Sequence, residues 1–111
     1  MTTGVLLICG SLQERSSNRA ALDVVRAKLG GLAGVSVEDA VEVGLIPPFN
    51  SDLEDVEDSS LTEFREQIAR ASAVIIATPE YAASTPGALK NALDWIVGSA
   101  ELYGRPVGLI A

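Results

Sequence analysis

The sequence predicts an α/β protein built on a parallel, doubly wound sheet. Runs of apolar strand-forming residues alternate with amphipathic helical stretches along the whole chain. Two of these runs, residues 5–9 and 73–77, are apolar without interruption, which is typical of parallel strands that are covered on both faces. Each of these two runs ends in a loop that leads into a helix start. The resulting order is β-α-β-α-β-α-β, with right-handed crossovers.

The first half of the chain contains two predicted strands and one helix. The strand at residues 5–9 is followed by a loop and then by a helix over about residues 19–29. Its apolar face holds Ala21, Leu22, Val25 and Leu29, and Gly30-Gly31 ends it. A weaker strand over about residues 35–43 alternates apolar and polar positions. Residues 45–50, with two consecutive prolines, are expected to form a loop over the strand ends.

The second half repeats the alternation. Ser60-x-x-Glu63 predicts a capping box at the start of a second helix, which has an apolar stripe formed by Leu61, Phe64, Ile68 and Ala71. The strand at residues 73–77 leads through a loop to a third helix, which Pro86 opens and which ends near residue 97. Gly104-Arg105-Pro106 then turns into a last strand at residues 107–111.

Composition narrows the classes of function. The chain has 111 residues, 48% of them hydrophobic, which suits one domain with a real core. A net charge of −7 argues against nucleic acid, and the lack of His excludes His-dependent nucleophilic catalysis and His-ligated metals. A single Cys forms no internal disulfide, and neither a membrane span nor a secretory signal is recognisable. We therefore expect a cytoplasmic protein.

Residues 51–58 hold five acids. They form either a site for a hard metal ion or a solvated loop that feeds a helix, and we favour the loop because adjacent acids point apart. The chain stops inside a predicted strand, so one long apolar edge is expected to lack a partner. We interpret residues 1–111 as a single domain that is truncated at its C-terminus or covered by another chain at that edge.

The loop after the first strand suits a phosphate. It lies between a strand end and a helix N-terminus, where free N–H groups and the helix dipole favour an anion. The hydroxyl and amide donors of Ser11, Ser16, Ser17 and Asn18 add to these groups, although the last three also suit a simple helix cap. The chain has no GxGxxG after this strand and no GxxxxGK[ST], which argues against dinucleotide-type and Walker-type sites. A phosphomonoester with an attached ring fits better.

The two loop regions resemble the NADPH-dependent FMN reductase family. The resemblance rests on GSLQERSSNRAAL and TPEYAASTPGALKNALDW, which are similar to the family patterns GSLRxxSxN and PEYNxSxPGxLKNAxDW. It implies a flavodoxin-like three-layer α/β/α fold with strand order 2-1-3-4, in which the last strand and helix are missing here. The first and third strands would then be neighbours, and FMN would lie between their ends.

The resemblance also implies the residues that hold the cofactor. The FMN phosphate would be surrounded by Ser11, Gln13, Ser16, Ser17 and Asn18. The isoalloxazine ring would be lined by Pro79, Glu80, Tyr81, Ala82 and Ser84, largely through backbone groups. We expect Glu80 to hold its loop, since flavin chemistry needs no side-chain acid, and Tyr81 to stack on the ring or cover the loop.

This chain departs from the family pattern in three ways. Gln13 stands where the family usually has Arg, which removes a bidentate phosphate partner that Arg15 would have to replace. Ala82 stands where the family usually has Asn. The loop after the fourth strand is missing, together with the last strand and helix. We therefore expect weaker FMN binding than in a full-length relative.

The third helix offers an interface hypothesis. Ala88, Ala92 and Trp95 lie about 120° around the helix from Leu89, so they form a second apolar face beside the one that packs on the sheet. One interpretation is an exposed anchor for a homodimer, which the resemblance also implies. The other is that Trp95 packs within the monomer, under residues 101–105. Lys90 and Asn91 are expected to be solvated or to anchor the helix rather than to bind an acidic partner.

The resemblance implies an NAD(P)H-dependent flavin oxidoreductase of the quinone reductase type. FMN would be the cofactor, NADPH or NADH the co-substrate, and a quinone, azo compound, metal ion or free flavin the acceptor. No side chain is expected to be catalytic, because the flavin carries the chemistry. The alternatives are a flavodoxin-like electron carrier and a non-catalytic fragment that binds no flavin.

Overall fold

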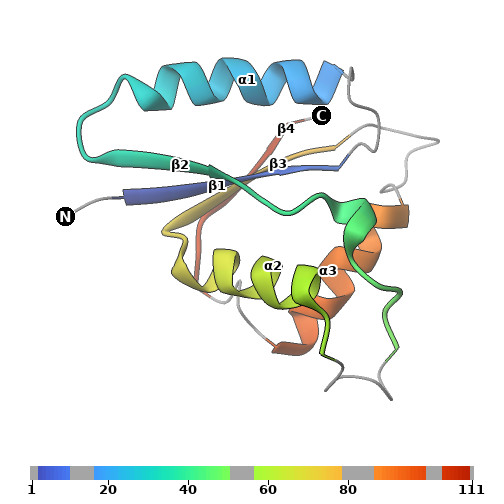
Figure 1. Ribbon diagram of the computed structural model, residues 1–111. Coiled ribbons are helices and arrows are strands. Elements are labelled where there is room, and N and C mark those ends of the chain that lie inside the picture. Colours follow the sequence, from blue (N-terminus) through green and yellow to red (C-terminus); the bar gives the residue numbers. More distant parts are fainter. Residues whose placement is uncertain (1–2, 11–16, 51–56, 79–86, 100–103, 111) are drawn as a thin grey trace.

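The computed structural model describes residues 3–10, 17–50, 57–78, 87–99 and 104–110 (Figure 1). These segments form a single four-stranded sheet with helices on both faces. The elements are β1 (Thr3–Cys9), α1 (Ser17–Gly30), β2 (Val35–Asp39), the short 3₁₀ helix η1 (Val43–Leu45), α2 (Ser59–Arg70), β3 (Ala73–Ala77), α3 (Gly87–Ser99) and β4 (Val107–Ile110).

The sheet has the order β2-β1-β3-β4, and every neighbouring pair is parallel. This confirms the predicted strand order. Helix α1 covers one face of the sheet, and α2 and α3 cover the other (Figure 1). The described chain is therefore a three-layer α/β/α arrangement, with β1 and β3 at its centre.

The central strands are buried on both sides, as their unbroken apolar runs predict. Leu6 and Ile8 of β1 point into the core shared with α2 and α3, whereas Val5 and Leu7 point into the core under α1. Successive side chains of a strand alternate between faces, so one apolar run serves two helix layers. This double burial fixes β1 in the middle of the sheet.

The second strand is shorter than predicted. It ends at Asp39. The N–H of Ala40 still donates to the carbonyl of Leu7 in β1 at 2.9 Å, and the N–H of Val41 donates to Oε1 of the buried Gln67 at 2.9 Å. Val43 then starts η1 and buries its side chain in the core of α2 and α3. The alternation of valines over residues 35–43 therefore combines a strand with a separate turn.

The start of α2 corrects the predicted capping box. The N-cap is Asp58, whose carboxylate accepts from the N–H of Leu61 at 3.0 Å, while Ser60 already lies inside the helix. The positive end of the helix dipole also stabilises a negatively charged carboxylate at this position. At the other end of α2, the guanidinium of Arg105 donates to the carbonyls of Ile68 (3.0 Å) and Ala69, which satisfies two terminal acceptors.

Strand β4 forms one edge of the described sheet. Its Val107 and Leu109 are exposed, Leu109 by 72%. They pair in register with Val74 and Ile76, which point into the core of α2 and α3, so they extend that apolar face past β3.

Across the described segments, no helix has the length and apolar character needed to cross a membrane.

Candidate functional site

The carboxyl ends of β1 and β3 lie side by side. Cys9 pairs with Ala77, and the N–H of Gly10 donates to the carbonyl of Ala77 at 2.7 Å. The next residue of β3's chain, Thr78, donates its N–H to the carbonyl of Ile110 in β4 at 2.9 Å. The loop that follows Gly10 and the loop that follows Thr78 therefore leave the sheet from neighbouring points.

Gly10 allows this close approach. A Cβ atom at this residue would lie 2.9 Å from Cδ2 of Leu89 and 3.0 Å from the carbonyl oxygen of Ala77. Both distances are shorter than ordinary van der Waals contact. The absence of a side chain lets the end of β1 pack directly against β3 and against Leu89, near the start of α3.

Two helix starts lie at the same end of the sheet. Helix α1 begins at Ser17 and α3 at Gly87, and Figure 1 shows both beginning on the side where β1 and β3 end. The first turn of α1 contains no acid and includes Arg19, which is half-buried and which sequence reasoning did not single out. Unpaired N–H groups and the positive end of the dipole at such a start suit a phosphate. The acid-free start of α1 is therefore compatible with a phosphate at this edge.

Most of the predicted cofactor-binding residues lie outside the described part of the chain. Their positions and roles stay predictions, and these residues are Ser11, Gln13, Ser16, Pro79, Glu80, Tyr81, Ala82 and Ser84. Ser17 and Asn18 are described as the first residues of α1, consistent with a place at its N-terminal end. The structure does place the residues that flank the two loops, and they lie together at one edge of the sheet.

The prediction that Trp95 is an exposed anchor is wrong. Its side chain is only 1% exposed, and it belongs to the core of α2 and α3 together with Ala92, which is 0% exposed. Ala88 is half-buried against the same core. The indole packs within the monomer, against residues 47–49. The helical periodicity of α3 gives no sign of this distant segment. The indole ring lies edge to face with Phe49, with centroids 5.0 Å apart, and the guanidinium of Arg65 lies 5.5 Å from its centroid.

Asn91 anchors the same neighbouring segment. Its side-chain amide accepts from the N–H of Phe49 at 2.6 Å and donates to the carbonyl of Pro47 at 2.9 Å. The indole N–H of Trp95 donates to that carbonyl as well, at 2.7 Å. Lys90, by contrast, is exposed and pairs with Asp94 one turn along the helix. The anchoring role weighed for these two residues therefore belongs to Asn91.

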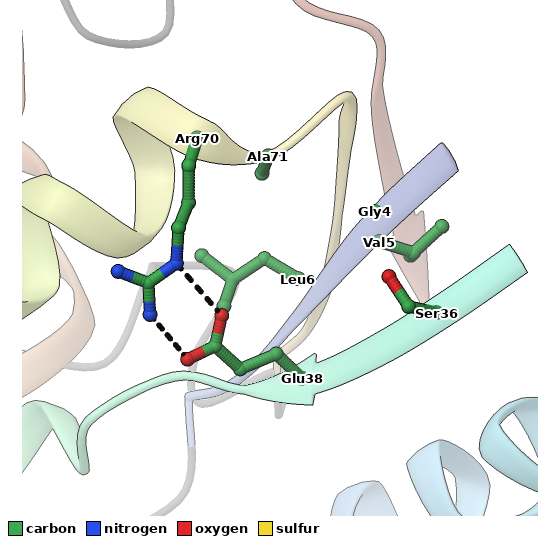
Figure 2. Close-up of a pocket in the computed structure, with 7 residues that line it drawn as sticks. All are labelled: Gly4, Val5, Leu6, Ser36, Glu38, Arg70 and Ala71. Atoms are coloured by element: carbon green, nitrogen blue, oxygen red, sulfur yellow. Dashed lines mark hydrogen bonds and ion pairs between the residues drawn. The ribbon is translucent and has the colours of Figure 1, made fainter. Parts of the chain in front are cut away.

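A separate pocket of about 130 Å³ lies toward the amino ends of β1 and β2 (Figure 2). It forms where the small residues Gly4 and Ser36 face the end of α2, and an ion pair between Glu38 and Arg70 closes one side. Ligands of open α/β sheets bind outside the carboxyl ends of the strands. This pocket lies at the opposite end, and we interpret it as a gap in the packing.

The ion pair beside this pocket gives a pH-dependent contribution to stability. Hydrogen bonds from Arg70 keep the pKa of Glu38 below its ordinary value of 4.5, partial burial opposes this, and a hydrogen bond from Gln67 adds to the lowering. A lowered folded-state pKa stabilises the protein above the unfolded-state pKa, and the stabilisation is lost as the pH falls through the folded value.

We therefore expect Glu38→Gln to be less stable than wild type at pH 7 by a small amount, because both partners are partly exposed. The difference should shrink as the pH falls below about 4.5, the ordinary pKa of the carboxyl. Urea unfolding of both proteins between pH 7 and pH 3 measures it. A deficit that stays constant over this range would show that the ionised carboxylate is not responsible.

Within the described residues, no group of three or more His, Cys, Asp or Glu side chains could hold a metal ion. Most of the acidic run at 51–58 lies outside the described segments, so the choice between a metal site and a solvated loop stays open for that run.

Parallel strands in the order 2-1-3-4, helices on both faces and neighbouring carboxyl ends of β1 and β3 define a flavodoxin-like α/β protein. The model of the NADPH-dependent FMN reductase family matches residues 3–111. The chain belongs to this family.

The chain is similar to several named reductases. It is 43% identical over 103 residues to a quinone reductase of Pseudomonas putida, covering 91% of this chain and 52% of that protein. It is 40% identical over 111 residues to an NAD(P)H-dependent FMN reductase of Pseudomonas aeruginosa, covering 96% of this chain and 57% of the relative. The chain thus spans little more than half the length of these relatives.

A solved structure gives the same picture of the fold. The flavoenzyme NAD(P)H:(acceptor) oxidoreductase FerB of Paracoccus denitrificans superposes with a TM-score of 0.85 at 30% identity, covering 98% of this chain and 60% of that protein. The apo form of an NADH:FMN oxidoreductase, with a TM-score of 0.78 at 24% identity, shares the fold.

Proposed function

We propose that this chain forms the FMN-binding part of a cytoplasmic NAD(P)H-dependent flavin oxidoreductase of the quinone reductase type. One observation carries the proposal. The carboxyl ends of β1 and β3 are hydrogen-bonded neighbours at Gly10 and Ala77, and the acid-free start of α1 lies at the same edge. This is the arrangement that a mononucleotide needs, with a phosphate at a helix N-terminus and a ring over an adjacent strand end.

The residues of this chain bind and orient the cofactor rather than perform the chemistry. When bound, FMN would supply the hydride and two-electron transfer chemistry between NAD(P)H and an acceptor such as a quinone. The N-terminal turn of α1, with Ser17, Asn18 and Arg19, would hold the phosphate. The loop with Glu80 and Tyr81 would support the ring, and its ends are fixed by the hydrogen bond of Thr78 to β4 and by the start of α3.

The relatives named for these activities support the proposal. Two relatives that are 43% and 40% identical to this chain over the aligned residues are named a quinone reductase and an NAD(P)H-dependent FMN reductase. Because Gln13 and Ala82 depart from the family pattern, we expect FMN binding to be saturable but weaker than in relatives that keep this pattern. A homodimer is a further proposal. Its support is the family resemblance alone, since the buried Trp95 cannot supply its anchor.

Activity measurements test the proposal. The purified chain, supplied with FMN, should oxidise one NADPH for each 1,4-naphthoquinone reduced, with the ping-pong rate law expected when one substrate leaves before the next enters. The control is FMN alone at the same concentration. Flavin binding without NADPH oxidation would favour an electron carrier, and a chain that binds no FMN would overturn the proposal. Sedimentation velocity of the same sample reports whether it is a dimer.

A further inference from the structure

Strand β4 forms an uncharged edge of the described sheet. Among the described residues it pairs only with β3, and none of its four residues, Val107–Ile110, carries a charged side chain. The opposite edge is different, because β2 carries Glu38 and Asp39, each in an ion pair with an Arg. Charged side chains on an edge strand hinder its pairing with another chain. The edge of β4, which lies beyond β3 in Figure 1, lacks that protection.

The same two residues of β4 carry its outward backbone groups and its exposed side chains. The N–H of Thr78 donates to the carbonyl of Ile110 at 2.9 Å, so Ile110 turns its backbone toward the chain of β3. Successive residues of a strand direct their backbone groups to opposite sides. The N–H and C=O groups of Val107 and Leu109 therefore point away from β3. The two residues are also 45% and 72% exposed.

A row of outward backbone groups selects an extended strand as its partner, because a strand offers unpaired N–H and C=O groups along its own edge. Val107 and Leu109 lie on the face of the sheet that α2 and α3 cover, so the partner should place apolar side chains at every second residue on that face. Strand β4 of a second copy has this pattern. The chain has a net charge of −7, and two acidic copies approach each other with least repulsion through an uncharged surface.

We propose that two copies of this chain form a dimer by antiparallel pairing of their β4 strands, with the two-fold axis at Gly108. Val107 of one copy then lies opposite Leu109 of the other, and the symmetry repeats this pair across the axis. Both residues direct their backbone groups outward, so each pair exchanges hydrogen bonds in both directions. This register also keeps the apolar side chains of both copies on one face of a continuous sheet.

Gly108 suits the centre of this pairing. The Gly108 residues of the two copies form a non-hydrogen-bonded pair, where antiparallel strands approach most closely, and they bring no side chains to the contact. The pairing closes as a dimer, because it uses the open edge of β4 in each copy. The homodimer considered above had the family resemblance as its support, and this edge adds a surface for it. The inference does not rest on the reductase function, since the pairing needs no flavin.

Sedimentation velocity over a range of concentrations tests the dimer. The wild-type chain should sediment as a dimer without FMN. Leu109→Lys should raise the dimer dissociation constant about a hundredfold, because each of the two buried Leu side chains contributes about tenfold. Val24→Lys is the matched control, since Val24 is an apolar residue of α1 that is 56% exposed, and it should leave the constant unchanged. Far-UV circular dichroism checks that both variants are folded.

Leu109→Pro tests whether the backbone takes part. It removes the outward N–H and leaves the pairing with β3 in place, because an edge strand tolerates Pro where the N–H faces away from the sheet. Leu109→Ala keeps that N–H but retains less apolar surface than Pro. We expect Leu109→Pro to weaken the dimer more than Leu109→Ala does. An equal or smaller effect of Pro would show that the copies do not pair as strands.

Gly108→Cys in a Cys9→Ser background tests the register, since Cys9 is the one Cys in the sequence. The Cα atoms of a non-hydrogen-bonded antiparallel pair lie about 4.5 Å apart, within the range that a disulfide spans. A Cβ at Gly108 would lie 3.8 Å from Cγ1 of Ile75, an ordinary contact, so the substitution should be tolerated. Mild oxidation should link the two copies efficiently. Leu109→Cys in the same background should link poorly, because the two copies of residue 109 lie diagonally across the axis.

The outcomes separate this inference from the proposed function. A wild-type chain that stays monomeric at every concentration would overturn it. A dimer that Leu109→Lys leaves intact would also overturn it, and would place the homodimer on another surface. Efficient linking through Leu109→Cys in place of Gly108→Cys would contradict the register. NADPH oxidation with FMN is measured separately, so the reductase function can stand when this inference fails.

Discussion

Trp95→Ala is expected to cost about 3–5 kcal/mol of the free energy of unfolding, the range for removing a buried Trp or Phe side chain. The indole is 1% exposed, packs edge to face with Phe49 and donates to the carbonyl of Pro47. A domain of this size is stable by roughly 5–15 kcal/mol, so the variant should lie close to global unfolding. Urea unfolding followed by far-UV circular dichroism measures the loss, because the variant retains no Trp to follow by fluorescence.

Trp95→Phe is the matched control for this substitution. It keeps an aromatic ring in the core and removes the N–H donor, while the carbonyl of Pro47 still accepts from Asn91. We expect its free energy of unfolding to fall by about 1 kcal/mol because the hydrogen bond is lost. The looser packing of the smaller ring should lower it further. If Trp95→Ala instead unfolds within about 0.5 kcal/mol of wild type, as surface substitutions do, the indole is exposed in solution and the interface hypothesis returns.

Gly10→Ala is expected to destabilise the protein by about 1–3 kcal/mol, the usual cost of overpacking a core, and to weaken FMN binding. The new methyl group would lie 3.0 Å from the backbone carbonyl of Ala77 and 2.9 Å from Leu89, which is 2% exposed and has little room to move. Relief requires the end of β1 to separate from β3. That separation would move apart the two loops that we propose grip the cofactor.

Gly4→Ala provides the contrast within the same strand. A Cβ at Gly4 would lie 3.6 Å from Oγ of Ser36, an ordinary contact beside the pocket at the other end of β1. We expect this variant to be stabilised by about 0.5–1 kcal/mol, because Ala loses less conformational entropy than Gly in a strand. Thermal unfolding of both variants, with and without FMN, gives the comparison. Equal behaviour of the two variants would show that the end of β1 has no special packing.

The architecture follows from local patterns in the sequence. The apolar runs at β1 and β3 are buried on both faces, and their alternation with helical stretches predicts the parallel sheet. The strand order needed more, because periodicity does not tell which strands are neighbours. It came from the family resemblance of the two loops, and the pairing of β1 with both β2 and β3 confirms it.

The errors arose where a contact between distant residues overrides the local pattern. The helical period correctly put Ala92 and Trp95 on a second face of α3, but it cannot show that residues 46–50 cover that face from 48 positions away. The alternation of valines suggested a strand up to Val43, but the pairing with β1 stops at Asp39, and beyond it the N–H of Val41 donates to the side chain of Gln67 in α2. At the start of α2, Asp58, Ser59 and Ser60 are all good capping residues, so the sequence alone cannot select Asp58.

The sequence also predicted only part of the candidate site. That the first and third strands end side by side was expected, and the hydrogen bond between Gly10 and Ala77 confirms it, whereas the placement of the two loops stays a prediction. The importance of Gly10 for packing against Leu89 was missed, because a Gly in a loop motif gives no sign of the helix that approaches it. Asn91 and Trp95 lie inside the stretch that carries the family resemblance, yet both contact the protein's own backbone.

An NMR titration of the ¹⁵N-labelled chain with FMN tests most directly where the cofactor binds. Saturable shifts are expected for the amides of Gly10, Ser17, Thr78 and Gly87, which flank the two loops at the ends of β1 and β3. The amides of Ser36 and Arg70, beside the pocket at the opposite end, should stay unchanged. Saturable shifts confined to that pocket, or no saturable shift at all, would contradict the placement of a flavin between β1 and β3.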